Sequence, residues 1–168
     1  MCGFLVTNAE LVEDYKLCSL LEQRGPDSTQ IKNIKNIKFY HTLLSLTGEF
    51  TPQPVTDGEI TALFNGEVYN YDELGDYTSD VFAIIDSYKK YGTSFLDYLD
   101  GEFAIILFDL KKNVIYFVSD VFGTKPLFYS FDDKSFGFSS YKEALVEVGY
   151  KNINKLEANS YGVLNITN

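Results

Sequence analysis

The sequence predicts a layered α+β sandwich, in which antiparallel strands are covered by helices. The segment 103–108 is continuously apolar, which is typical of a strand buried on both faces. Strand-like segments follow one another across short turns in the second half of the chain, as in antiparallel hairpins. Segments 80–91 and 141–148 read as helices that can cover the sheets.

In the first half of the chain, apolar and β-branched residues predict strands at 3–6, 38–46 and 59–64. The segment Glu10–Gln23 has its leucines at helical spacing, and Arg24-Gly25-Pro26-Asp27 ends this helix because Gly and Pro stop helices. Two prolines and two glycines in 48–58 indicate a loop.

In the second half, Thr78, Ser79 and Asp80 offer N-caps for a helix from about Asp80 to Tyr91, which ends at Gly92. The apolar face of this helix consists of Val81, Ile84, Ile85 and Tyr88. Further strands are expected at 102–109, 114–119, 126–131, 135–139 and 160–166, and a short helix at 141–148.

Length and composition bound the function. The 168 residues indicate one domain, and 45% hydrophobic with 16% aromatic residues excludes a disordered chain. The net charge of −10 argues against nucleic acid and against membrane surfaces as partners. A basic leader and a long apolar run are both missing from the sequence, so a cytoplasmic location is expected.

Cys2 directly follows the initiator Met1, and removal of Met1 would place a thiol and a free α-amine on one residue. A thiol has a reference pKa of ~8.5, and an α-amine of ~7.7–8.0 can take its proton near neutral pH. The alternative is a small residue that merely opens a strand. The only histidine, His41, is mid-strand and is expected to be structural, which makes a Cys-His dyad the weaker hypothesis.

The sequence offers no ordinary zinc site, because it has two cysteines and one histidine. A disulfide between Cys2 and Cys18 is not expected in a cytosolic chain. Asn65-Gly66 follows a predicted strand and offers a side-chain amide and an unhindered backbone N–H, the donors that an oxyanion needs. Taken alone, Asn-Gly is more often the signature of a tight turn than of an oxyanion hole.

Several strings occur together in one order: Cys2-Gly3, Arg24-Gly25-Pro26-Asp27, His41 with Leu44-Ser45-Leu46, Asn65-Gly66-Glu67-Val68-Tyr69-Asn70, Thr78-Ser79-Asp80, Gly101-Glu102-Phe103-Ala104, and Asp120 to Tyr129 with Gly123, Lys125 and Pro126. This order and spacing resemble the glutaminase domain of asparagine synthetases, a class II glutamine amidotransferase. The similarity runs from Cys2 to about Tyr161, nearly the whole chain.

The resemblance implies a four-layer αββα N-terminal-nucleophile hydrolase sandwich. Neither a cofactor nor a metal is expected. The resemblance also implies that Cys2 attacks the side-chain amide of glutamine to form a thioester, with its own α-amine as base. It further implies Asn65 and Gly66 as the oxyanion hole, Asp80 as the partner of the glutamine α-amine, and Glu67 and Leu46 as residues that line the pocket.

One departure concerns the substrate. The family string His-x-Arg-Leu-Ser reads His41-Thr42-Leu43-Leu44-Ser45 here, so Leu43 stands where an arginine would clamp the α-carboxylate. The family's Arg-Asp before Gly-x-Lys-Pro reads Ser119-Asp120, and the only arginine, Arg24, belongs to Arg-Gly-Pro-Asp. Loss of such a bidentate pair weakens binding roughly ten- to a thousandfold.

A second departure concerns the ammonia. The chain ends where the ATP-using domain of asparagine synthetases would begin, and it has no Gly-rich phosphate loop. A single glutaminase domain spanning 1–168 is therefore expected to supply a separate ATP-dependent synthetase chain. Two alternatives stay open: a binding or regulatory module whose catalysis is weakened or lost, and an amidase for a substrate without an α-carboxylate.

Overall fold

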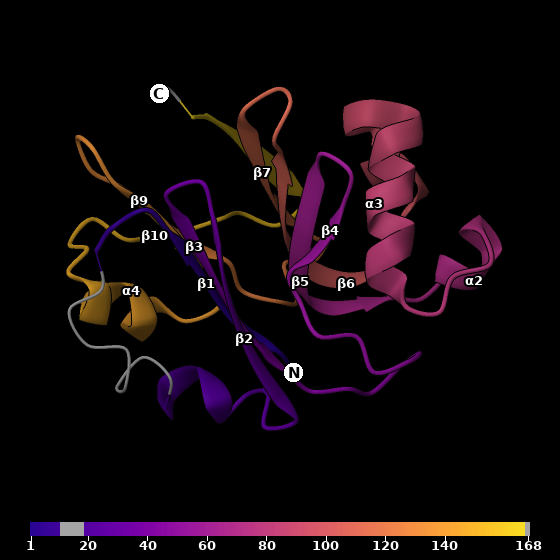
Figure 1. Cartoon of the computed structure of the whole chain (residues 1–168), viewed down its shortest axis with the longest axis horizontal. Coiled ribbons are helices and arrows are strands. Elements are labelled where there is room, and N and C mark those ends of the chain that lie inside the picture. The colour runs from indigo at the N-terminus through magenta and orange to yellow at the C-terminus, as the bar shows by residue number, and fades with distance from the viewer. Residues whose placement is uncertain (11–18, 167–168) are drawn as a thin grey trace.

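A computed structural model describes residues 1–10 and 19–166, which form two stacked antiparallel sheets between helices (Figure 1). The first sheet contains β1 (Gly3–Thr7), β2 (Ser28–Ile34), β3 (Ile37–Leu43), β8 (Phe128–Phe131), β9 (Phe136–Ser139) and β10 (Asn154–Lys155). Its strand order is β10-β8-β9-β1-β3-β2, which places the first strand of the chain inside the sheet.

The second sheet contains β4 (Val55–Asp57), β5 (Ile60–Val68), β6 (Gly101–Asp109), β7 (Val114–Ser119) and β11 (Ser160–Asn165). Its order is β11-β7-β6-β5-β4, so β6 is central. The helical elements are α2 (Tyr71–Leu74), α3 (Asp80–Tyr91), the 3-10 helix η1 (Gly92–Tyr98) and α4 (Lys142–Val148), and residues 19–22 are also helical.

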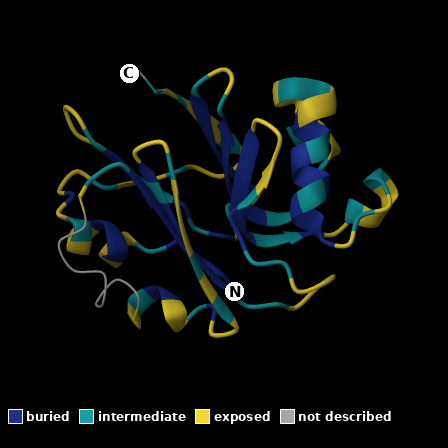
Figure 2. Cartoon of the chain, in the orientation of Figure 1, coloured by how far each residue is buried: buried dark blue, intermediate teal, exposed yellow. Residues whose placement is uncertain are grey.

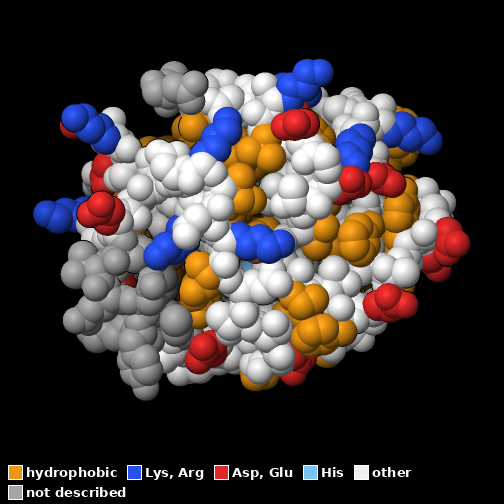
Figure 3. All heavy atoms as spheres, viewed as in Figure 1, with side chains coloured by type: hydrophobic (Ala, Val, Ile, Leu, Met, Phe, Trp, Pro, Cys, Tyr) orange, Lys and Arg blue, Asp and Glu red, His pale blue; other side chains and the backbone are white. Residues whose placement is uncertain are grey.

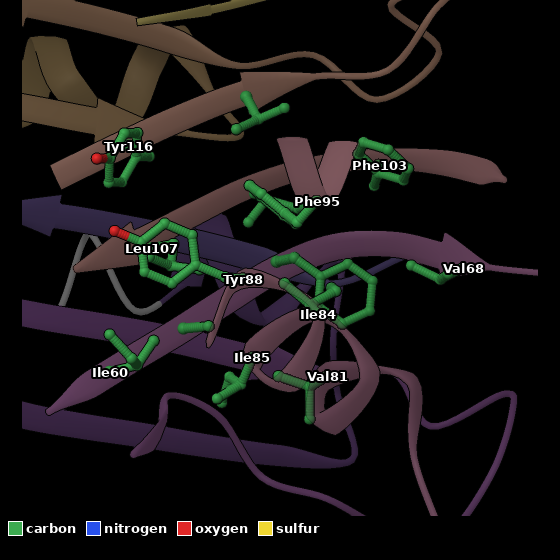
Figure 4. Packing of buried hydrophobic residues seen from close by; sticks show 14 of the residues in the cluster. Ile60, Val68, Val81, Ile84, Ile85, Tyr88, Phe95, Phe103, Leu107 and Tyr116 are labelled. Atoms are coloured by element: carbon green, nitrogen blue, oxygen red, sulfur yellow. The ribbon is translucent and has the colours of Figure 1, made fainter. Parts of the chain in front are cut away.

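Three apolar layers hold the sandwich together. Between the two sheets lie side chains that include Phe4, Val6, Phe39, Leu63, Ile106, Phe108 and Phe138. The outer face of the second sheet packs against α3 through Val81, Ile84, Ile85 and Tyr88 (Figure 4). On the outer face of the first sheet, Leu5, Leu21 and Tyr40 pack with Ala144 and Leu145 of α4. These layers confirm the predicted four-layer αββα sandwich.

The central strand β6 is buried on both faces, as its continuous apolar run predicts. Phe103, Ile105 and Leu107 join the layer under α3, whereas Ala104, Ile106 and Phe108 face the other sheet. Figure 2 shows the strands of the interior buried and the connecting loops exposed.

The predicted α3 is confirmed at both ends, from Asp80 to Tyr91, and Gly92 follows it with a positive φ of 60°. Ser79 precedes the helix without a side-chain capping bond, because its hydroxyl instead lies 3.3 Å from Asp80 Oδ1. The predicted hairpins around 110–113 and 132–133 are also present.

Two predicted strand ends are wrong. The strand expected at 38–46 ends at Leu43, because the next backbone groups leave the ladder. Leu44 N–H donates to Cys2 Sγ at 3.5 Å, and Ser45 N–H donates to Asp27 Oδ2 at 2.8 Å. The strand expected at 59–64 continues to Val68, since β6 pairs with it as far as Gly101. Asn65-Gly66 therefore lies within a strand, and the tight-turn alternative is wrong.

Other elements lie outside the sequence prediction. The loop expected at 48–58 contains β4, which pairs with β5 around Gly58. The edge strand β2 pairs along the whole of β3 and has no counterpart among the predicted strands. Most of the predicted helix 10–23 falls on residues 11–18, which lie outside the described part, and so does Cys18.

The surface bears on possible partners. Figure 3 shows charged side chains of both signs spread over one face, with hydrophobic side chains between them. Within the described ranges, no helix is both long enough and apolar enough to cross a membrane. The expectation that nucleic acid and membranes are not partners stays a prediction.

Candidate active site

Cys2 lies immediately before β1, the strand held between β9 and β3 inside the first sheet. Its thiol is free and only 7% of the residue is exposed. Arg24 Nε donates to the Cys2 carbonyl oxygen at 3.1 Å, and Leu44 N–H donates to its sulfur at 3.5 Å. Backbone pairing and these two contacts fix the sulfur at one end of the sandwich.

The environment of the thiol acts on its pKa in two directions. Burial raises the pKa of Cys2, and the Leu44 N–H bond opposes this by favouring the thiolate. The free α-amine in this structure belongs to Met1, and burial lowers its pKa. While Met1 is attached, the nitrogen of Cys2 is part of a peptide bond and cannot serve as a base.

His41 does not contact the thiol in the described structure. Its ring is buried, and Nε2 lies 3.2 Å from the Phe64 carbonyl oxygen. Burial lowers the pKa of His41 to about 4, so the imidazole is neutral at physiological pH. This position agrees with a structural role linking β3 to β5.

Asn65 presents a buried amide that has no hydrogen-bond partner within the described structure. The residue is 0% exposed, and neither Nδ2 nor Oδ1 is satisfied. An unsatisfied buried polar group costs about 1–3 kcal/mol, so such a group calls for a functional explanation. Asn65 has the same strand parity as Leu63, which places its side chain on the face of β5 that meets the first sheet.

Gly66 is required by the backbone. Its φ is +143°, and a Cβ there would lie 1.9 Å from the Glu102 carbonyl oxygen of β6. Backbone N–H groups two residues apart point to the same strand edge. Phe64 N–H donates to Gln53 Oε1 at 2.8 Å and Val68 N–H to Asp80 Oδ2 at 3.2 Å, so the Gly66 N–H lies between them on that edge.

One cavity brings the predicted site together. Its lining includes Cys2, Leu43, Leu46, Asn65, Gly66, Glu67 and Asp80, which are all the residues assigned a role from the sequence. The volume available inside it is about 100 Å³. A thiol, an unpartnered amide and a buried carboxylate thus meet in one space, the combination needed to hold and attack an amide.

Asp80 contributes a carboxylate that is only 7% exposed, at the start of α3. Burial raises the pKa of Asp80 to about 6, against the bonds from Val68 N–H and the Ser79 hydroxyl. Within the described residues, no lysine or arginine pairs with it. A desolvated carboxylate of this kind is suited to an incoming ammonium group.

The lining residues that were given no role from the sequence include Gln53, Glu102 and Lys125. Lys125 Nζ lies 2.7 Å from Glu102 Oε1. Glu102 pairs in register with Glu67 on the neighbouring strand. Two like charges opposite each other in a ladder repel unless a cation lies nearby. The register that sets these two glutamates opposite each other comes from the structure, so no signal in the sequence alone pointed to Lys125.

Comparisons with known proteins place these features in a wider group. The family model described as "Glutamine amidotransferase domain" matches residues 1–166. A putative glutamine-hydrolysing asparagine synthetase of Methanocaldococcus jannaschii is 34% identical, over 82% of this chain and 27% of its own length. Glutamine-hydrolysing asparagine synthetase 2 of Bacillus subtilis is also 34% identical, over 68% of this chain and 17% of its own length.

The chain therefore spans less than a third of either relative. Among solved structures, the allosteric regulatory enzyme of purine biosynthesis superposes with a TM-score of 0.77 over 98% of this chain and 47% of that one. The sequence identity is 15%, so this likeness bears on the fold alone. It supports the αββα arrangement.

Proposed function

Because the chain belongs to the glutamine amidotransferase domain family, in its asparagine synthetase type, we propose that it hydrolyses a glutamine side-chain amide at Cys2 and releases ammonia. One observation carries the proposal. The buried amide of Asn65 has no partner of its own and opens into the cavity that contains the Cys2 thiol. A hydrogen-bond donor held ready in this way serves an oxyanion that exists only during the reaction.

The reaction begins once Met1 has been removed. The α-amine of Cys2 takes the thiol proton, and Sγ bonds to the amide carbon. The charge that develops on the amide oxygen is met by Asn65 Nδ2 and the Gly66 N–H. The C–N bond then breaks, ammonia leaves with the proton held by the amine, and a thioester remains on Cys2. Water, deprotonated by the same amine, attacks the thioester carbon. The C–S bond breaks to give a carboxylic acid, and the proton on the amine returns to the sulfur to restore the Cys2 thiol.

Asp80 orients the substrate in this scheme. Its ionised carboxylate, buried and without a described cationic partner, binds the substrate amine. Lys125, the lysine that lines the cavity, is already paired with Glu102. Arg24 lies outside the lining and donates to the Cys2 carbonyl oxygen. An ATP-dependent synthetase chain is the proposed consumer of the ammonia, in keeping with the names of the relatives.

The test is ammonia release from glutamine by protein whose mass shows that it starts at Cys2. The proposal expects turnover, its loss in Cys2→Ala, and covalent labelling of Cys2 by a glutamine-like diazoketone. The control is Cys2→Ser, which keeps the size of the side chain and lacks the thiolate chemistry.

One observation favours a second candidate, a binding module without turnover. Leu43 offers the cavity an apolar side chain where the resemblance implies an arginine clamp. Retained ligand binding, with no ammonia release and Cys2 unlabelled, would replace the first candidate by this one.

A further inference from the structure

The charges of the cavity are unbalanced. The carboxylates that line it are Glu49, Glu67, Asp80 and Glu102. Among the described lining residues, Lys125 is the single lysine or arginine, and its ammonium is 2.7 Å from Glu102. Four carboxylates against one engaged lysine ammonium and the N-terminal amine beside Cys2 still favour a cationic ligand and repel an anionic one.

The wall at 43–45 offers little to an anion. Leu43 contributes an alkyl side chain. Of the two N–H groups that follow, Leu44 N–H is directed to Cys2 Sγ at 3.5 Å and Ser45 N–H to Asp27 Oδ2 at 2.8 Å. A carboxylate is normally recognised by a guanidinium fork or by free N–H groups, and both of these N–H groups are already directed elsewhere.

The side of the cavity that contains Asp80 favours a cation. Asp80 is nearly buried, accepts from the Val68 N–H and the Ser79 hydroxyl, and is not paired with a described lysine or arginine. The unpartnered Asn65 amide, fully buried on the same cavity, independently marks the place where a ligand carbonyl fits. Together these groups provide for an amine and an amide.

We propose that the substrate of this site carries an amine and a side-chain amide but no free carboxylate beside the amine. A glutaminyl group whose α-carboxyl is bonded to another group, as at the amino end of a peptide, has this chemistry. The inference rests on the proposed amide hydrolysis at Cys2 and adds the class of substrate. Hydrolysis of such a group breaks the C–N bond of the side-chain amide with one water and yields a carboxylate and ammonium.

Three small amides of matched length distinguish the contribution of the substrate amine from that of its carboxylate. Glutamine has both groups, 4-aminobutanamide has the amine without the carboxylate, and glutaramate has the carboxylate without the amine. Ammonia release is measured for each with protein confirmed to start at Cys2. We expect kcat/KM for 4-aminobutanamide to equal or exceed that for glutamine, and glutaramate to be the poorest substrate.

The variant Leu43→Arg tests the cause. It should raise kcat/KM for glutamine by about ten- to a thousandfold, the value of one bidentate charge-assisted pair. It should lower or leave unchanged kcat/KM for 4-aminobutanamide, which gains nothing from a guanidinium. Leu43→Met is the matched control, because it supplies a long unbranched chain without charge and should keep the native order of preference.

The outcomes are distinct. Native protein that prefers glutamine over 4-aminobutanamide by tenfold or more overturns this inference and leaves the proposed hydrolysis standing. Ammonia from none of the three amides, with Cys2 unreactive to the diazoketone, overturns the proposed function and this inference with it. A Leu43→Arg protein that gains nothing on glutamine shows that position 43 does not face the carboxylate and also overturns the inference.

Discussion

Asp80→Asn should stabilise the folded protein while impairing its activity. The ordinary pKa of this carboxyl is 3.8, and burial raises it to about 6 in the folded chain. A tenfold difference in proton affinity corresponds to about 1.4 kcal/mol, so ionising Asp80 costs the native state about 3 kcal/mol. Asparagine removes the charge but loses one acceptor at the Val68 N–H or the Ser79 hydroxyl, worth ~1 kcal/mol. The net gain is about 2 kcal/mol.

The pH dependence identifies the cause. The folded state holds the Asp80 proton more tightly than the unfolded state does, so native protein loses stability as pH rises from 3.8 to about 6. The advantage of Asp80→Asn should be absent near pH 4 and complete near pH 8. Substrate binding should weaken at low pH instead, because the substrate amine needs ionised Asp80. KM should therefore rise as pH falls below about 6.

The assay is urea unfolding of both proteins across this pH range, followed by far-ultraviolet circular dichroism. Asp72→Asn is the control, since Asp72 lies in the first turn of α2 and is exposed. It should change stability by a few tenths of a kcal/mol and without a transition near pH 6. An Asp80→Asn protein that is no more stable than native at pH 8 would refute the view that the ionised Asp80 carboxylate destabilises the folded protein.

Three other changes probe the same site. Asn65→Ala should lower kcat by about 10²–10³ while Cys2 still reacts with iodoacetamide, and undiminished kcat would remove Asn65 from the oxyanion hole. Gly66→Ala should destabilise the fold by ~3 kcal/mol or more in urea, because its Cβ would lie 1.9 Å from the Glu102 carbonyl oxygen; a stable variant would show that β5 and β6 can separate there. Protein that retains Met1 should release no ammonia, with protein cleaved to Cys2 as its control, and equal rates would exclude the α-amine as base.

The sequence predicted correctly those elements whose ends are set by neighbouring residues. The bounds of α3 follow from one apolar face and a terminal glycine, and the structure reproduces them. The extent of β5 depends instead on its partner at 101–104, far along the chain, so a sequence pattern could not separate a strand from a turn at Asn65. The edge strand β2 was missed because most of its residues are polar and none is buried, and its pairing with β3 is what makes it a strand.

The residues that the structure brings together around the cavity could be named from the sequence, but the ion pair among them could not. Family resemblance selected Cys2, Asn65, Gly66 and Asp80, and the structure gathers them around one cavity. The ion pair of Lys125 with Glu102 joins the loop between β7 and β8 to the start of β6, and no local pattern specifies this approach. The charge balance within the cavity therefore could not be predicted without the three-dimensional structure.

The alternation along β6 has a consequence for folding. A strand whose two faces serve different layers cannot shift by one residue without exchanging both sets of side chains. The same register sets Phe103 opposite Gly66 and Ala104 opposite Asn65. Correct pairing of the hydrophobic interior and correct placement of Asn65 and Gly66, the proposed oxyanion donors, therefore depend on the same register. A misregistered chain would be both unstable and inactive, so recovery of activity after dilution from urea should report directly on the pairing of β5 with β6.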